Sequence, residues 1–245
     1  MKDWLDTLLF GYYPYVCLTV FLLGSLIRFD RDQYTWKSDS SQLLRAGQLR
    51  WGSNLFHVGV LFLFFGHAIG MLTPHAVYAP LISAGDKQLL AMVSGGLFGL
   101  LGFIGLSILL HRRLSDSRIR ATSRRSDIAV LVLLWLQFAL GLATVPLSAQ
   151  HLDGSVMMKL AEWAQRILTF RGGAVELLAG VSPVFKCHMF LGMTIFLLFP
   201  FSRLVHVWSG FATLAYVFRP YQLVRSRRLN LPVDHELPQR SGAQV

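Results

Sequence analysis

The sequence contains few charged residues and few cysteines, and each shortage excludes a class of protein. Asp, Glu, Lys and Arg make up 15% of its 245 residues, against about 25% in soluble proteins. Two cysteines, Cys17 and Cys187, are too few for a disulfide scaffold, a four-cysteine zinc site or an iron–sulfur cluster. The chain also has no internal repeat, P-loop or dinucleotide-binding fingerprint. The sequence is instead rich in apolar residues, with 53% hydrophobic residues and 18 Phe.

Most of these apolar residues lie in five long runs. Each run reaches or approaches the roughly 20 apolar residues that cross a bilayer as a helix. None of the 13 acidic residues lies within them. The sequence therefore predicts an all-α, polytopic membrane protein whose five-helix domain covers residues 1–230. The predicted spans are residues 8–27, 55–72, 89–110, 128–147 and 184–208.

In a membrane protein, the distribution of positive charge indicates the orientation of the chain. A formal charge of +10 would suggest nucleic acid binding in a soluble domain. Here 17 of the 23 Lys and Arg lie in residues 28–54, in residues 111–127 and in the tail after Val207, with Arg203 counted in the tail. Because cytoplasmic loops carry the excess of Lys and Arg, we expect the N-terminus outside, the C-terminus inside and no nucleic acid partner. Two acids and one lysine precede the first run, which favours a retained helix over a signal peptide.

Two segments lie outside the spans. Residues 155–170 place apolar side chains three and four positions apart, which predicts an amphipathic helix. It could lie in the outer membrane interface or pack on the end of the bundle. Residues 231–245 mix Pro, Gly, Gln and charges, and we expect a disordered cytoplasmic tail there.

Four of the eight histidines fall inside predicted spans, where ionisable side chains are costly and usually functional. The second span carries His57 and His67, and the fifth carries His188 and His206. These spans run antiparallel, so His57 and His206 should lie near the cytoplasmic side and His67 and His188 near the exterior. If each span is one helix, the two histidines of a span are about 15 Å and about 27 Å apart along the axis. The histidines of one span therefore cannot share an ion.

Two cross-helix histidine pairs at two depths predict two bis-imidazole haems. A zinc site is an alternative, although each pair offers only two nitrogens and only Cys187 lies nearby. Packing or proton transfer is another. Small residues beside the histidines would leave room for a flat macrocycle, or would serve helix contact; they are Gly59, Gly66, Gly70, Gly192 and Gly210. We expect no ligand role for the other histidines, which are His75, His111, His151 and His235.

At these residues the sequence resembles the gamma subunit of bacterial respiratory nitrate reductase, a membrane di-haem cytochrome b. The resemblance runs from about residue 12 to residue 228 and rests on ordered motifs at the family spacing. They are Gln33-Tyr-Thr-Trp36, Ser53-Asn-Leu-Phe-His57, Gly66-His67, Gly70-Met-Leu-Thr-Pro-His75, Arg118-Ile-Arg-Ala-Thr122, Ser148-Ala-Gln-His-Leu-Asp-Gly-Ser155, Leu191-Gly-Met-Thr194, Leu197-Leu-Phe-Pro-Phe-Ser-Arg203 and Tyr221-Gln-Leu-Val-Arg225.

The resemblance implies a role for each candidate residue. His57 and His206 would ligate the haem b nearest the cytoplasmic partners, and His67 and His188 the distal haem b. A lysine of the second exterior loop, here Lys87, would bind quinol close to Gly66 and the distal haem. The second arginine of the basic pair that ends the third span, here Arg113, would contact a haem propionate. The residues concerned are His57, His67, His188, His206, Lys87, Gly66 and Arg113.

The resemblance also implies a place in a complex. Menaquinol or ubiquinol would be oxidised in a bacterial inner membrane, and electrons would pass to an iron–sulfur beta subunit and a molybdopterin-containing alpha subunit that reduces nitrate. Alternatives are a related di-haem cytochrome b that serves a heterodisulfide-reductase-like enzyme, or a membrane anchor or transporter without redox function.

Overall fold

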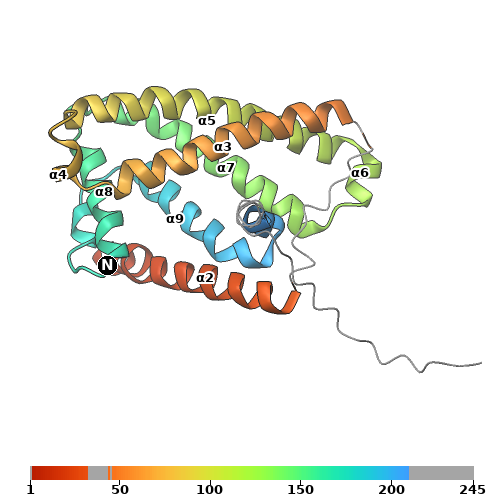
Figure 1. Ribbon diagram of the computed structural model, residues 1–245, viewed down its shortest axis with the longest axis horizontal. Helices are drawn as coiled ribbons and strands as arrows, with labels where there is room; N and C mark the ends of the chain where they lie inside the picture. The colour runs from red at the N-terminus through yellow and green to blue at the C-terminus, as the bar shows by residue number, and fades with distance from the viewer. Residues whose placement is uncertain (1, 33–43, 45, 210–245) are drawn as a thin grey trace, which may run out of the picture. The chain divides into compact units, whose positions relative to one another are not determined.

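Helices form all the regular structure in the part of the chain that the structure, a computed structural model, describes (Figure 1). That part is residues 2–32, 44 and 46–209. The motifs at residues 33–36 and 221–225, Gly210 and the predicted tail lie outside it. In chain order the elements are α1 Lys2–Thr7, the π-helix η1 Leu8–Tyr12, α2 Tyr13–Asp32, α3 Ala46–Leu72, α4 His75–Tyr78, α5 Ala84–Ser115, α6 Ser117–Ala121, α7 Arg125–Ser148, α8 Ser155–Leu168, the 3₁₀ turn η3 Val175–Leu178, α9 Pro183–Leu198, and the 3₁₀ turns η4 Phe199–Phe201 and η5 Arg203–Val205.

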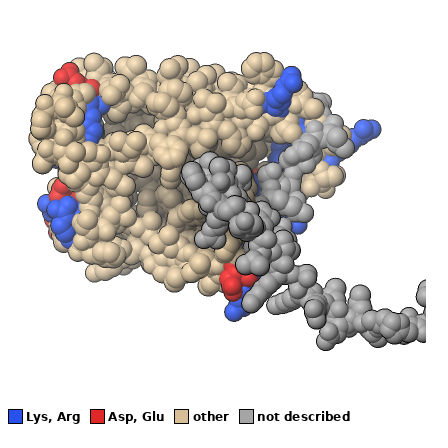
Figure 2. Space-filling model, viewed as in Figure 1, with Lys and Arg blue, Asp and Glu red and all other residues tan. Residues whose placement is uncertain are grey.

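Five helical stretches are long and apolar enough to cross a membrane, which confirms the predicted number of spans. They are Trp4–Arg31, Ala46–Leu72, Ala84–Ser115, Arg125–Ser148 and Pro183–Phe201. Figure 2 shows charged residues near the two ends of the helix bundle and an uncharged surface between them. We call these the α6 end and the α8 end, after the short helices that mark them in Figure 1.

Small residues bring α3 and α5 into close contact. A Cβ atom on Gly59 would lie 2.6 Å from the Cα of Gly102, and one on Gly105 would lie 2.4 Å from the backbone nitrogen of Phe56. Glycines at such crossings let helix backbones approach where no hydrophobic effect drives association. The packing continues from α5 to α7, from α7 to α9 and from α9 to α2. Within the described residues, α3 and α9 are not an extensively packed pair.

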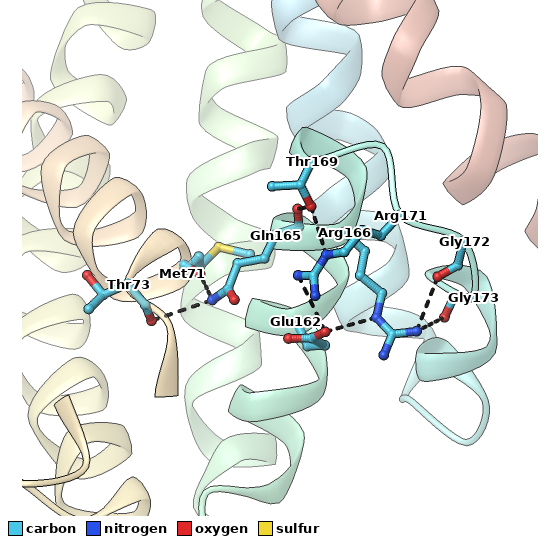
Figure 3. Close-up of polar contacts among 9 residues, drawn as sticks. All are labelled: Met71, Thr73, Glu162, Gln165, Arg166, Thr169, Arg171, Gly172 and Gly173. Carbon is cyan, nitrogen blue, oxygen red and sulfur yellow. Dashed lines mark hydrogen bonds and ion pairs between the residues drawn. The ribbon is translucent and has the colours of Figure 1, made fainter. Parts of the chain in front are cut away.

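The amphipathic segment forms α8, and its contacts place it on the end of the bundle. Trp163 is buried and donates a hydrogen bond from Nε1 to the Phe10 carbonyl at 3.0 Å. Gln165 donates to the carbonyls of Met71 and Thr73, at 2.8 and 3.4 Å, just where α3 ends (Figure 3). Those carbonyls have no partner within the helix, so Gln165 caps α3 from another element. Of the two readings of this segment, the structure shows the packed helix.

The fifth span differs from its prediction as one helix over residues 184–208. α9 ends at Leu198, and the turns η4 and η5 follow it. Pro200 lies in the first turn and has no N–H to donate. Ser202, between the turns, has extended backbone with φ −117° and ψ 177°. His206 therefore does not continue the axis of α9, and the axial distance of 27 Å expected from His188 does not apply.

Candidate functional site

The four histidines of the spans form two opposed pairs. His57 and His67 project from α3, His188 projects from α9, and His206 directly follows the turn η5. The ring centres of His57 and His206 are 6.2 Å apart, and those of His67 and His188 are 6.3 Å apart. The structure thus brings together the partners that their depths predict.

Both distances suit a metal ion held between two imidazoles. A bond of about 2.0 Å from the metal to each ring nitrogen, plus the distance from each nitrogen to its ring centre, puts opposed ring centres roughly 6 Å apart. No group of three or more His, Cys, Asp or Glu that could hold a metal occurs within the described residues. The zinc alternative therefore gains no further ligands here. A haem would need only the two imidazoles of each pair from the protein, because it brings the nitrogens of its own macrocycle.

Three of the histidines use Nδ1 in the same way. Each places this atom 2.7 Å from a backbone carbonyl, and a carbonyl can only accept, so Nδ1 carries the proton. Nε2 then keeps its lone pair, and this nitrogen, which could bind a metal, faces away from the backbone. The acceptors for His57, His67 and His206 are the carbonyls of Ser53, Leu63 and Arg203.

His188 has a different environment. Its Nδ1 is buried without a hydrogen-bond partner, and its Nε2 lies 3.5 Å from the side-chain nitrogen of Gln137 on α7. A Cβ atom on Gly141 would lie 3.1 Å from its Cε1. Gln137 and Gly141 therefore bound this ring from α7, although neither carried a signal in the sequence.

The glycines named beside the histidines do not share one role. Added Cβ atoms on Gly66 and Gly70 would meet nothing within 4 Å, and His67 beside them is exposed. Gly59 packs on α5, and an added Cβ on Gly192 would lie 3.1 Å from Gln137. Open space is thus found at Gly66 and Gly70, whereas Gly59 and Gly192 serve helix contact.

A cationic cluster lies beside the His57–His206 pair. Arg113 is 9% exposed, and its Nη1 lies 3.8 Å from the Asp127 carboxylate. Arg203 lies 3.9 Å from the same carboxylate, and its carbonyl accepts the bond from His206. Guanidinium groups form strong charge-assisted hydrogen bonds with anionic oxygens, so these two arginines suit an anionic group such as a propionate. Sequence reasoning selected Arg113 and missed Asp127 and Arg203.

Lys87 lies near the α8 end, in the first turn of α5 rather than in a loop. Its Nζ lies 3.5 Å from the ring centre of Tyr78 and is buried without a hydrogen-bond partner. Tyr78, at the end of α4, is buried, and desolvation raises the pKa of its hydroxyl. His67 is five residues from the end of α3 and Lys87 three residues into α5, so both lie within about 8 Å of that end of the bundle. An ammonium held by an aromatic face keeps its N–H groups for a ligand.

The fold and the site define a class of protein: a helical membrane protein with five candidate spans that holds two opposed histidine pairs at two levels. Residues 6–227 match the nitrate reductase gamma subunit family, and the chain belongs to it. Membership of this family supports a role in a nitrate reductase, an oxidoreductase complex with further subunits.

Curated relatives agree over nearly their whole lengths. The chain is 56% identical to the respiratory nitrate reductase 2 gamma chain of Escherichia coli K12, covering 93% of this chain and 100% of that one. It is 52% identical to the respiratory nitrate reductase 1 gamma chain of the same strain, covering 92% and 99%. The nitrate reductase gamma chain of Bacillus subtilis is 39% identical, with 90% and 98% covered.

Proposed function

We propose that this chain is the membrane cytochrome b subunit of a respiratory nitrate reductase. It oxidises a membrane quinol and passes the electrons, by way of two haems b, to an iron–sulfur beta subunit. A molybdopterin-containing alpha subunit then reduces nitrate in the cytoplasm. The observation that carries the proposal is the pair of opposed imidazole sites, with ring centres 6.2 and 6.3 Å apart, in a member of this family.

The chain's own residues would hold each haem and balance its charge. His67 and His188 would hold one haem b and His57 and His206 the other, while Arg113 and Arg203 would face a propionate. A bound haem b accepts and releases one electron at a time, with a potential set by its ligands and surroundings.

Quinol, as menaquinol or ubiquinol, would bind near Lys87 and Gly66 at the α8 end. The Lys87 ammonium would donate a hydrogen bond to a quinol oxygen while Tyr78 holds it in place. Oxidation to the quinone releases two electrons and two protons. With the α8 end facing outward in a bacterial inner membrane, the protons leave outside and the electrons move inward, which adds to the proton-motive force.

The experiment is haem analysis of the purified complex. Its dithionite-reduced spectrum should show a b-type α-band, and haem content should be two per gamma chain. His111→Ala serves as a matched control, because this histidine belongs to neither pair and should leave both haems in place. A spectrum without a b-type band would leave the histidines with a packing or proton role and overturn the proposal.

A further inference from the structure

The break in the fifth span is held by an arginine from another helix. Arg28, one turn from the end of α2, donates from Nη1 to the carbonyls of Pro200 and Ser202, at 2.7 and 3.0 Å. These carbonyls belong to the segment where the helical bonding of α9 stops. Helix ends leave carbonyls without intrahelical partners, and a membrane supplies no water to satisfy them. The two N–H groups of Nη1 can serve two such acceptors.

The same face of α2 packs on the break. Phe21, Gly24 and Arg28 follow one another at three- and four-residue spacings, which places them on one stripe of the helix. The Phe21 ring meets the Phe199 ring edge-on, with centres 4.9 Å apart. A Cβ atom on Gly24 would lie 2.8 Å from Cγ of Pro200. The turn η4 therefore has a matching surface on α2.

The break continues directly into a histidine of the site. Ser202 Oγ accepts from the Leu204 backbone N–H at 3.2 Å, which starts the turn η5. The Arg203 carbonyl, inside that turn, accepts from Nδ1 of His206 at 2.7 Å. The position of Ser202 thus sets the turn, and the turn sets the direction of the His206 ring toward His57.

We propose that Arg28 is a positioning residue for the haem held by His57 and His206. By fixing the carbonyls of Pro200 and Ser202 it directs the His206 ring toward His57, whereas the His67–His188 site does not depend on it. This inference rests on the proposed function, because it assigns a residue to one of the two proposed haems.

The test is a potentiometric titration of the purified complex with both haems resolved. The haem that disappears in His206→Ala identifies the site. Arg28→Gln should shift the midpoint potential of that haem or lower its content by half or more, with the other haem unchanged. Gly24→Ala, which presses on Pro200, should have the same selective effect. Arg31→Gln, three residues along the same helix, and Gly47→Ala, where an added Cβ meets nothing within 4 Å, are the matched controls.

Each result decides the inference. Unchanged content and potential of the His206 haem in Arg28→Gln would overturn it, and so would equal changes in both haems. If Arg28→Gln fails to accumulate, Arg28→Lys decides, because it keeps the charge but loses the planar guanidinium that reaches both carbonyls. A shift confined to the His206 haem supports the inference, and no shift overturns it. A wild-type complex without haem would instead overturn the proposed function.

Discussion

Each intramembrane histidine has one partner across the bundle, and this makes the pairing testable residue by residue. Replacing either member of a pair by Ala should abolish the same haem, because the proposed haem would lose one of the two imidazoles that hold it. We therefore expect His67→Ala and His188→Ala to lose one haem, and His57→Ala and His206→Ala to lose the other.

Low-temperature spectra of the four variants would check this pairing. His67→Ala should also stop quinol oxidation, because the proposed quinol site is near that pair. Retention of both haems in His67→Ala would contradict the assignment, as would matching losses in His67→Ala and His57→Ala.

Tyr78 should affect quinol binding through Lys87. A cation–π contact contributes about 1 kcal/mol, which corresponds to roughly a fivefold change in affinity. Tyr78→Leu should weaken binding of a quinol analogue by about that factor, and Lys87→Ala should weaken it further, with haem content intact in both. Tyr78→Phe keeps the ring face and should bind the analogue like the wild type. Fluorescence titration with a quinol analogue measures all three, and unaltered binding in Lys87→Ala would remove it from the site.

Whether the role of a residue could be predicted from the sequence depends on the kind of contact it makes. The opposed histidines could be predicted because depth follows from position along antiparallel spans. Asp127, Arg203 and Gln137 could not be predicted in the same way, because their roles depend on which helix packs beside which. Arg28 is the clearest case of a role that the sequence does not predict. Its charge indicates only the orientation of the chain, and its contacts exist only because α9 ends at Leu198.

At the scale of elements, the close packing of α3 on α5 should be sensitive to a single methyl group. Gly105→Ala would place Cβ 2.4 Å from the Phe56 backbone nitrogen, so the two helices must separate. We expect a loss of about 1–3 kcal/mol, the usual cost of overpacking, seen as a lower unfolding temperature of the purified complex. Gly96→Ala lies on the same helix in open space and should leave the temperature unchanged or raise it. Equal stability of the two variants would contradict this account of the packing.

Among the elements, the long helices were predictable and their irregularities were not. Apolar runs identify spans whatever their neighbours, although the helices extend past the runs because polar residues such as Lys87 also join their first turns. The end of α9 near Pro200 depends on α2 as well as on proline, since α2 supplies the donors for the carbonyls that lack a helical partner. The docking of α8 depends likewise on Trp163 and Gln165 reaching other elements.

At the scale of the whole molecule, the charge distribution predicts the orientation of the bundle. Lys159 on α8 and Arg120 on α6 are both exposed and lie at opposite ends. In a chain whose Cys17 and Cys187 are replaced by Ala, Lys159→Cys should react with a membrane-impermeant maleimide in spheroplasts. Arg120→Cys should react only after the membrane is opened, because the end richer in Lys and Arg faces the cytoplasm. The reverse pattern would invert the proposed direction of electron flow.

The unbroken length of α3 has a consequence for the speed of the proposed electron transfer. One histidine of each pair belongs to this helix of 27 residues, ten positions from the other. Their separation of about 15 Å along the axis is therefore set by the geometry of one continuous helix. Electron transfer slows as the distance between the sites grows. Movement of α2 or α9 can change how each site is closed but not how far apart the two histidines of α3 are. The number of residues between His57 and His67 in α3 therefore limits the rate of electron transfer between the two proposed sites.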